Sequence, residues 1–206
     1  MIRRRLCIVA LALGFGLGLW PAALPAQKSA PPAPAGLADQ SIGETGAAVT
    51  VVEYFSTSCH FCAKFHNTTW PELKAKYVDT GKVRFVLRDF PNDLPGLAGA
   101  MLARCLGEAK WYGATDRLLR EQDAWTHAQN VGHALADIAR AEGMSREAFD
   151  ACMLNRPLYE TIRAAALRAR DEFGISSTPT FFINGEKRTG ALTLEEFEAI
   201  LAPLLK

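Results

Sequence analysis

The chain has 206 residues, of which 49% are hydrophobic, and 23 basic and 22 acidic side chains leave a formal net charge of +1 at pH 7. This length suits one domain with a substantial core. No basic stripe interleaved with aromatic residues occurs, which argues against nucleic acid as a partner.

The first 26 residues have the pattern of a secretory signal peptide. Residues 3–5 are arginines, residues 6–20 are apolar, and residues 21–26 end in small side chains. We expect cleavage after Ala26. The apolar core is short for a membrane span, which needs about 20 residues, and an uncleaved N-terminal anchor is the alternative. Either route places the rest of the chain outside the cytoplasm, where disulfides persist.

A segment rich in proline and alanine follows at residues 27–46, and 30–35 is its densest part. This composition favours extended or flexible chain over packed structure. We therefore predict a tether at 27–46 that leads into one folded domain at 47–206.

The domain begins with a pattern of strand, helix and strand. The apolar run at 49–56 is typical of a central parallel strand. A helical pattern follows at 59–78, with a kink expected at Pro71. Residues 83–88 read as the second strand.

From residue 94 to residue 174 the pattern is helical, interrupted by short breaks. Strand character returns at 180–183, where Asn184-Gly185 predicts a hairpin that leads back through 187–190. A last helix is expected at 194–204. The predicted fold is therefore α/β: a thioredoxin fold with a helical domain, about 94–174, inserted between its βαβ and ββα halves.

The sequence Cys59-His60-Phe61-Cys62 stands where the first strand gives way to the helix. Residues three apart on a helix are neighbours, so the two sulfurs can form a disulfide. The helix N-terminus favours a thiolate at Cys59, and a thiolate is the nucleophile in thiol–disulfide exchange. A purely structural disulfide is one alternative. Zinc is another, but it needs four ligands, and no second Cys-x-x-Cys or suitably spaced histidine pair is present; haem attachment would require histidine at Ala63. We expect no metal and no cofactor.

Two further cysteines remain once the signal peptide, with Cys7, is removed. Because Cys59 and Cys62 pair locally, elimination assigns Cys105 to Cys152 as a structural disulfide. Both residues lie on apolar helix faces, so two buried, unlinked thiols are the alternative.

Three stretches resemble the DsbA-type thiol:disulfide oxidoreductases of bacterial envelopes: residues 51–62, residues 174–185 with Ser-Thr-Pro-Thr-Phe-Phe, and Gly190-Ala191-Leu192. The resemblance extends from about residue 49 to the C-terminus. It implies that Cys59 is the exposed nucleophile and Cys62 the resolving cysteine. It also implies a cis Thr178-Pro179 peptide facing the Cys59 sulfur, with the Thr178 backbone free to pair with an extended substrate.

The same resemblance implies a periplasmic thiol:disulfide oxidase that transfers its Cys59–Cys62 disulfide to exported proteins. A membrane quinone reductase of the DsbB type would reoxidise it, and we expect a monomer. A disulfide isomerase or reductase is the alternative, because threonine before the cis-proline also occurs in isomerase relatives. A non-catalytic metallochaperone or surface binding module would instead favour Cys-x-x-x-Cys with a partnering histidine.

Two residues near the cysteines are candidates for proton handling. Family members often carry histidine directly before the second cysteine, whereas here Phe61 stands there and His60 follows the nucleophile. We expect His60 to act as a neutral donor to the Cys59 thiolate, or to be an exposed histidine without a role. Glu53 shares a strand face with apolar residues, so we expect it to lie buried beneath the site and to accept the Cys62 proton. A satisfied structural acid is the alternative.

Overall fold

In a computed structural model of the protein, residues 31–206 are described. The predicted signal peptide at 1–26, and with it the question of an uncleaved anchor, lies outside these residues. Among the described residues, none of the helices has the length and apolar character needed to cross a membrane.

The described chain contains a five-stranded sheet in the order β1-β3-β2-β4-β5. The strands are β1 (Gln40–Ile42), β2 (Val49–Phe55), β3 (Val83–Asp89), β4 (Thr180–Ile183) and β5 (Glu186–Thr189). The pair β2 and β3 is parallel, and the other pairs are antiparallel. Since β2 is central and covered on both faces, its run of apolar residues is explained by burial.

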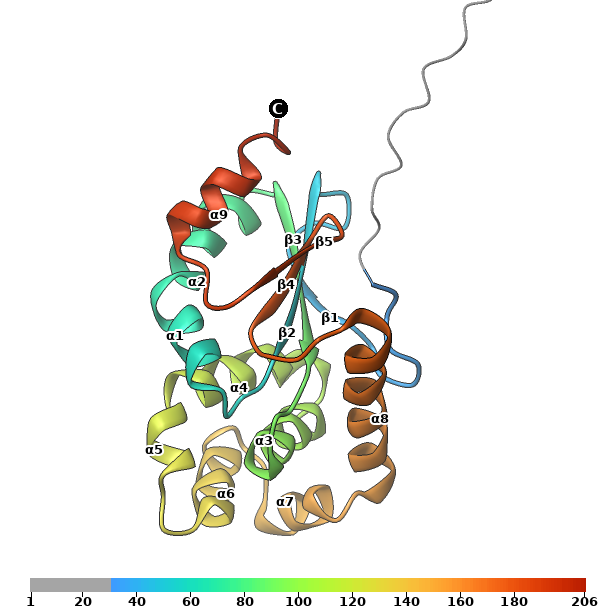
Figure 1. Cartoon of the computed structure of the whole chain (residues 1–206). Helices are drawn as coiled ribbons and strands as arrows, with labels where there is room; N and C mark the ends of the chain where they lie inside the picture. The colour runs from blue at the N-terminus through green and yellow to red at the C-terminus, as the bar shows by residue number, and fades with distance from the viewer. Residues whose placement is uncertain (1–30) are drawn as a thin grey trace, which may run out of the picture.

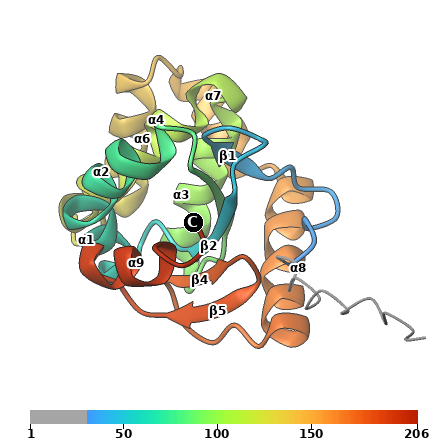
Figure 2. The ribbon, with the colours of Figure 1, turned by 90° about the horizontal axis from the view of Figure 1, so that it is seen from above.

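Helices cover the sheet and extend beyond one of its ends (Figure 1). They are α1 (His60–Thr68), α2 (Trp70–Leu73), the π-helical turn η1 (Lys74–Val78), α3 (Leu94–Cys105), α4 (Glu108–Arg120), α5 (Gln122–Thr126), α6 (Val131–Ala141), α7 (Arg146–Met153), α8 (Arg156–Phe173) and α9 (Leu194–Leu201). Seen from above, α1, α2 and α9 lie on one side of the sheet and α8 on the other (Figure 2). Helices α3 to α8 separate β3 from β4, which confirms the predicted thioredoxin fold with its helical insertion.

The helix expected at 59–78 is interrupted at Thr69, two residues before the kink expected at Pro71. Helix α1 ends at Thr68 and α2 begins at Trp70, so that Pro71 falls in the first turn of a new helix. Proline has no N–H to donate, and the first turn is where that group has no helical partner. Thr69 stands at the break, and its hydroxyl donates to the Leu192 carbonyl at 3.1 Å. The interruption therefore lies at Thr69, two residues before Pro71, because proline fits the start of a helix better than its interior.

Part of the predicted tether belongs to the folded domain. Leu37 is buried in the core, and β1 pairs antiparallel with β3. Asp39 accepts two hydrogen bonds of 2.7 Å from the buried Arg88 guanidinium. The boundary predicted at residue 47 is therefore wrong for this segment. A three-residue edge strand is too short to show alternation in sequence, and here contacts with β3 stabilise it.

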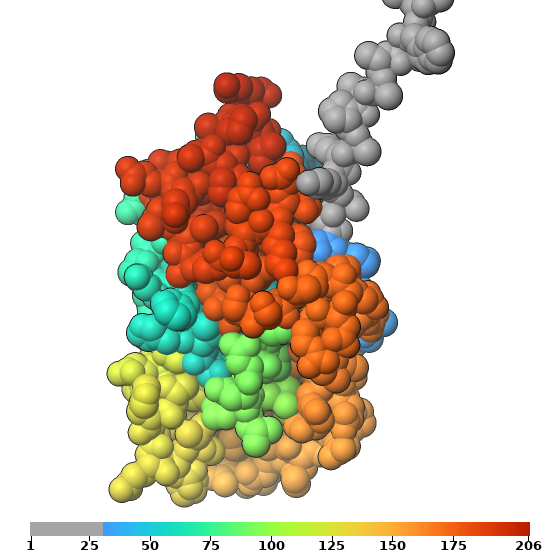
Figure 3. All heavy atoms as spheres, viewed as in Figure 1, coloured from blue at the N-terminus to red at the C-terminus, as the bar shows by residue number. Residues whose placement is uncertain are grey.

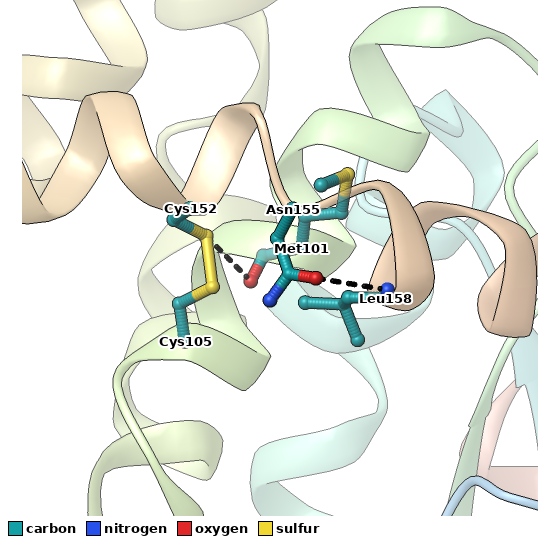
Figure 4. The surroundings of a disulfide bond; sticks show 5 residues. All are labelled: Met101, Cys105, Cys152, Asn155 and Leu158. Carbon is teal, nitrogen blue, oxygen red and sulfur yellow. Dashed lines mark hydrogen bonds between the residues drawn. A yellow bond between two sulfur atoms is a disulfide. The ribbon is translucent and has the colours of Figure 1, made fainter.

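The C-terminal end of α3 is linked to α7 by a disulfide between Cys105 and Cys152, the pair that elimination assigned. On one face of the molecule, the surface residues of α3 lie between those of α1 and those of α8 (Figure 3). The disulfide lies beside the junction where α7 gives way to α8, and Asn155 there accepts from the Leu158 N–H at 3.1 Å (Figure 4). The disulfide therefore links α3 to α7, immediately before α8 leads the chain back to β4.

Removing the carboxylate of Asp39 is expected to lower the free energy of unfolding by about 3 kcal/mol, because a buried guanidinium loses its charged partner. Urea denaturation of Asp39→Ala would measure this. Ser41→Ala is the matched control, because Ser41 accepts only an exposed hydrogen bond from Arg84, and we expect a change within about 0.5 kcal/mol. Equal effects of the two substitutions would contradict the packing of this segment.

Replacing both Cys105 and Cys152 by alanine is expected to lower the free energy of unfolding by about 4 kcal/mol, because closing a loop of about 48 residues restricts the unfolded chain. Denaturant titration of oxidised wild type and variant would measure the difference. A variant with wild-type stability but no thiol exchange would contradict a structural role for this pair.

Candidate active site

The two cysteines of the Cys-x-x-Cys sequence lie at the start of α1, directly beyond the end of β2. Cys59 is the N-cap residue, with extended backbone angles of −77° and 118°, and its carbonyl accepts the first helical bond from the Ala63 N–H at 3.0 Å. Cys62 is in the first turn and has no exposed surface, whereas Cys59 is partly exposed. A thiol or disulfide of another molecule can therefore reach the sulfur of Cys59 but not that of Cys62.

The two thiols bind their protons very differently. The pKa of Cys59 is lowered to about 6, chiefly by a hydrogen bond from the Cys62 thiol. Burial opposes this shift, while Thr178 and the backbone N–H groups of Cys62 and Phe61 add to it. The pKa of Cys62 is raised by burial, by its bond to Cys59 and by the charge of Glu53. A thiolate at Cys59 and a protonated thiol at Cys62 follow.

A cis peptide between Thr178 and Pro179 lies against the nucleophile. The Cys59 thiol is 3.3 Å from the Thr178 carbonyl oxygen, which can accept its hydrogen bond. The Thr178 hydroxyl in turn accepts from the Asn92 amide at 2.7 Å. Three loops, after β2, after β3 and before β4, therefore meet at the Cys59 sulfur.

The helical insertion makes hydrogen bonds and close contacts with the loop between β2 and α1, which leads into the two cysteines. The Ser58 hydroxyl donates to Asp93 at 2.7 Å, and the Gln122 amide donates to the Ser58 carbonyl at 2.5 Å. A Cβ atom at Gly99 would clash with the Thr57 hydroxyl, so only glycine allows this approach of α3. Sequence reasoning missed these residues. Only Asp93 carried a usable signal, since it precedes Leu94-Pro95 as a helix-capping residue and accepts from the Gly96 N–H.

His60 is exposed at the first position of α1, with its ring 5.8 Å from the ring of Phe61. Within residues 31–206, the hydrogen bonds that lower the pKa of Cys59 come from Cys62, Thr178 and the α1 backbone. The expected role of His60 as a donor to the thiolate therefore stays a prediction. Phe61 is 58% exposed beside the nucleophile and presents an apolar surface there.

Glu53 lies in β2 with no exposed surface, in the position expected from its strand face. Its Oε2 atom is 3.0 Å from Nε2 of His66, a residue that sequence reasoning did not single out. The signal was available, because His66 follows Cys62 by four residues and so shares its helix face. Among the described residues no group of three or more histidine, cysteine or acidic side chains is placed to hold a metal ion.

Two adjoining hollows, of about 310 and 390 Å³, lie between α8 and the loop that follows β3. They share four lining residues: Pro91, Asn92, Ala166 and Leu167. Because Asn92 also holds the Thr178 hydroxyl, the hollows begin next to the cis-proline loop. Leu94, which is 71% exposed, lines the smaller one.

A dithiol at a strand-to-helix junction, facing a cis-proline loop on this sheet, defines a thioredoxin-fold protein built for thiol–disulfide exchange. The sequence matches the family described as Thioredoxin over residues 37–202. The chain belongs to the thioredoxin family, and within it resembles the DsbA type.

Similar proteins carry names that agree with this site. A Rickettsia felis protein named as a protein-disulfide oxidoreductase is 32% identical over 169 residues, 82% of this chain and 60% of that protein. A Bacillus anthracis protein named disulfide bond formation protein D is 26% identical over 71% of this chain and 70% of its own length. The chain spans 53% to 60% of the length of the Rickettsia relatives.

Solved structures agree as well. Wolbachia pipientis alpha-DsbA1 is 28% identical and superposes with a TM-score of 0.74 over 81% of this chain and 90% of that one. Chlamydia trachomatis DsbA, at 18% identity and a TM-score of 0.69 over 80% of this chain and 90% of that one, shares the fold.

Thiolate absorbance of the reduced protein is expected to rise with a midpoint near pH 6, the lowered pKa of Cys59. In Cys62→Ala the midpoint should move up, because the largest stabilising hydrogen bond is lost. The Cys59→Ala variant is the control and should lack the transition. A wild-type midpoint near the ordinary value for cysteine would contradict the thiolate assignment.

Proposed function

We propose that the protein is a thiol:disulfide oxidase that passes its Cys59–Cys62 disulfide to exported proteins. The observation that carries the proposal is the opposite shift of the two cysteine pKa values, lowered at Cys59 and raised at Cys62. Stabilising one thiolate stabilises the reduced dithiol, and a stable reduced form makes the corresponding disulfide a strong oxidant.

The reaction follows from which sulfur is accessible. A client thiolate attacks the partly exposed Cys59 sulfur, the Cys59–Cys62 bond breaks, and Cys62 leaves with the electron pair as a thiolate that then takes up a proton. A second client thiolate attacks the client sulfur of the mixed disulfide. Cys59 leaves as the stabilised thiolate, so the client is oxidised and the enzyme is reduced.

The surface around Cys59 supports an extended client segment. The Thr178 carbonyl lies at the edge of the cis-proline loop, where backbone groups can pair with a peptide. Phe61 is exposed next to Cys59, Leu94 is exposed in the lining of the smaller hollow, and the two hollows continue away from the site. These features favour contact through backbone and apolar side chains, and hence many clients rather than one.

We further infer that the protein works in the periplasm, with export directed by residues 1–26, and that a DsbB-type membrane quinone reductase restores its disulfide. The charged start and apolar core of the N-terminal sequence support export. The disulfide between Cys105 and Cys152 supports an oxidising compartment. After each turnover the reduced dithiol needs an oxidant, and a membrane quinone supplies a sink for two electrons.

Equilibration of the Cys59–Cys62 couple with glutathione is expected to give a potential well above that of thioredoxin, which is about −270 mV. Mass spectrometry after acid quenching would count the free thiols at each glutathione ratio. A potential near the thioredoxin value would contradict the oxidase and favour the alternative reductase.

Cys59→Ala is expected to abolish oxidation of a reduced two-cysteine peptide, because the attacked sulfur is gone. The Cys105→Ala/Cys152→Ala variant is the control and should keep its turnover at temperatures where it stays folded. Residual oxidation by Cys59→Ala would place the exchanging disulfide elsewhere in the chain.

A further inference from the structure

A carboxylic acid and an imidazole are paired in the core beneath Cys62. Glu53 from β2 and His66 from α1 are 0% and 3% exposed, and their Oε2 and Nε2 atoms are 3.0 Å apart. The rings of Phe55, Phe65 and Trp70 surround the imidazole, with centroids 5.3 to 6.3 Å away. Burying two such polar groups is costly, and a purely structural need for them in this apolar layer is not evident.

The pair is placed to act on Cys62. His66 follows Cys62 by one helical turn on α1, so the two side chains lie on the same face. The charge of Glu53 is close enough to raise the pKa of the Cys62 thiol. A proton that leaves Cys62 therefore has a carboxylate nearby and no direct route to solvent.

The hydrogen-bond pattern indicates how the proton on the imidazole is arranged. Among the described residues, Nδ1 of His66 and Oε1 of Glu53 are buried and have no hydrogen-bond partner. A buried N–H without an acceptor is rarer and costlier than a lone pair without a donor. The ring proton therefore belongs on Nε2, where it is donated to Glu53, and Oε1 is left as the free carboxylate atom.

We propose that His66 is a positioning residue for the proton of Cys62: its Nε2–H holds Glu53 as a carboxylate whose Oε1 atom takes up and returns that proton. The assignment rests on the proposed thiol–disulfide exchange and adds a residue to it. His66 acts on Cys62 through Glu53, whose Oε2 atom it contacts at 3.0 Å.

The step in which this matters is reoxidation. Cys59 is then joined to an oxidant in a mixed disulfide, and the Cys62 thiol gives its proton to Oε1 of Glu53. The Cys62 thiolate attacks the Cys59 sulfur, the bond from Cys59 to the oxidant breaks, and the oxidant leaves as a thiolate with the electron pair. When the disulfide is passed to a client, the proton returns from Glu53 to Cys62.

Other titratable groups on the surrounding elements are already paired. Asp89 on β3 accepts from Arg104 at 2.6 Å, and Tyr112 on α4 accepts from the Trp70 indole at 2.9 Å. On α1 the nearby titratable groups are Cys59, Cys62 and the exposed His60. Because His60 is unchanged in the His66 variants, a difference between them and the wild type in the pH dependence of Cys62 attack is a readout of the Glu53–His66 pair.

The test is the reaction of the reduced full-length protein with excess oxidised glutathione, followed by acid quench and mass spectrometry. The first phase joins glutathione to Cys59, and the second releases it when Cys62 attacks. His66→Met and His66→Gln form a matched pair of similar length, because only glutamine keeps an N–H for Glu53.

In His66→Met the second phase is expected to slow by about tenfold and its pH midpoint to rise, because Glu53 loses its donor and keeps its proton. In His66→Gln the second phase should stay within about threefold of wild type at every pH, since the donor is retained. In a Glu53→Gln background the methionine substitution should add no further slowing.

An unchanged second phase in His66→Met would overturn the assignment. A strongly slowed second phase in His66→Gln would also overturn it, because the imidazole itself would then be the proton carrier. The His66→Gln measurement decides this even if the methionine variant does not fold. Failure of the first phase in the wild type would instead contradict the proposed function, so the two conclusions are tested separately.

Discussion

The hydrogen bond between the Cys62 thiol and the Cys59 sulfur is the interaction on which the site depends. It is the largest contribution that lowers the pKa of Cys59, and it exists only because Cys59 caps α1 while Cys62 lies one turn inside. The same burial that keeps the Cys62 proton in place keeps incoming thiols away from that sulfur. One short helical segment thus separates the attacked sulfur from the leaving one.

Much of the remaining structure holds that segment in place. The cis Thr178-Pro179 loop brings a carbonyl to the Cys59 sulfur, and Asn92 fixes the threonine hydroxyl from the loop after β3. Gln122 reaches the cysteine loop from the helical insertion. The insertion is therefore part of the active-site frame, and a disulfide and the buried Arg104–Asp89 ion pair reinforce it.

The polar groups of the core are distributed on the two faces of the sheet. On one face Arg88 binds Asp39 and Tyr54 and holds the N-terminal segment. On the other face Glu53 and His66 lie beneath Cys62, among aromatic rings. The first pair ties chain segments together. The second leaves Oε1 of Glu53 without a hydrogen-bond partner, and this is the atom to which we assign the proton of Cys62.

The sequence alone determined the order of strands and helices, the helical insertion and the position of the two cysteines, because hydrophobic periodicity and the Cys-x-x-Cys spacing are local properties. It located the break near Pro71 to within two residues, and it placed Glu53 on a buried strand face. It missed β1, whose three residues are held by Arg88 and β3. It also missed Asn92, Gln122 and His66, since their roles depend on contacts between distant segments or across the core. The sequence predicted a thiolate at Cys59 from the helix N-terminus, but only the tertiary structure showed that the Cys62 thiol and Thr178 stabilise it and that burial keeps the proton on Cys62, because burial and hydrogen bonding at a sulfur are set by the segments that fold around it.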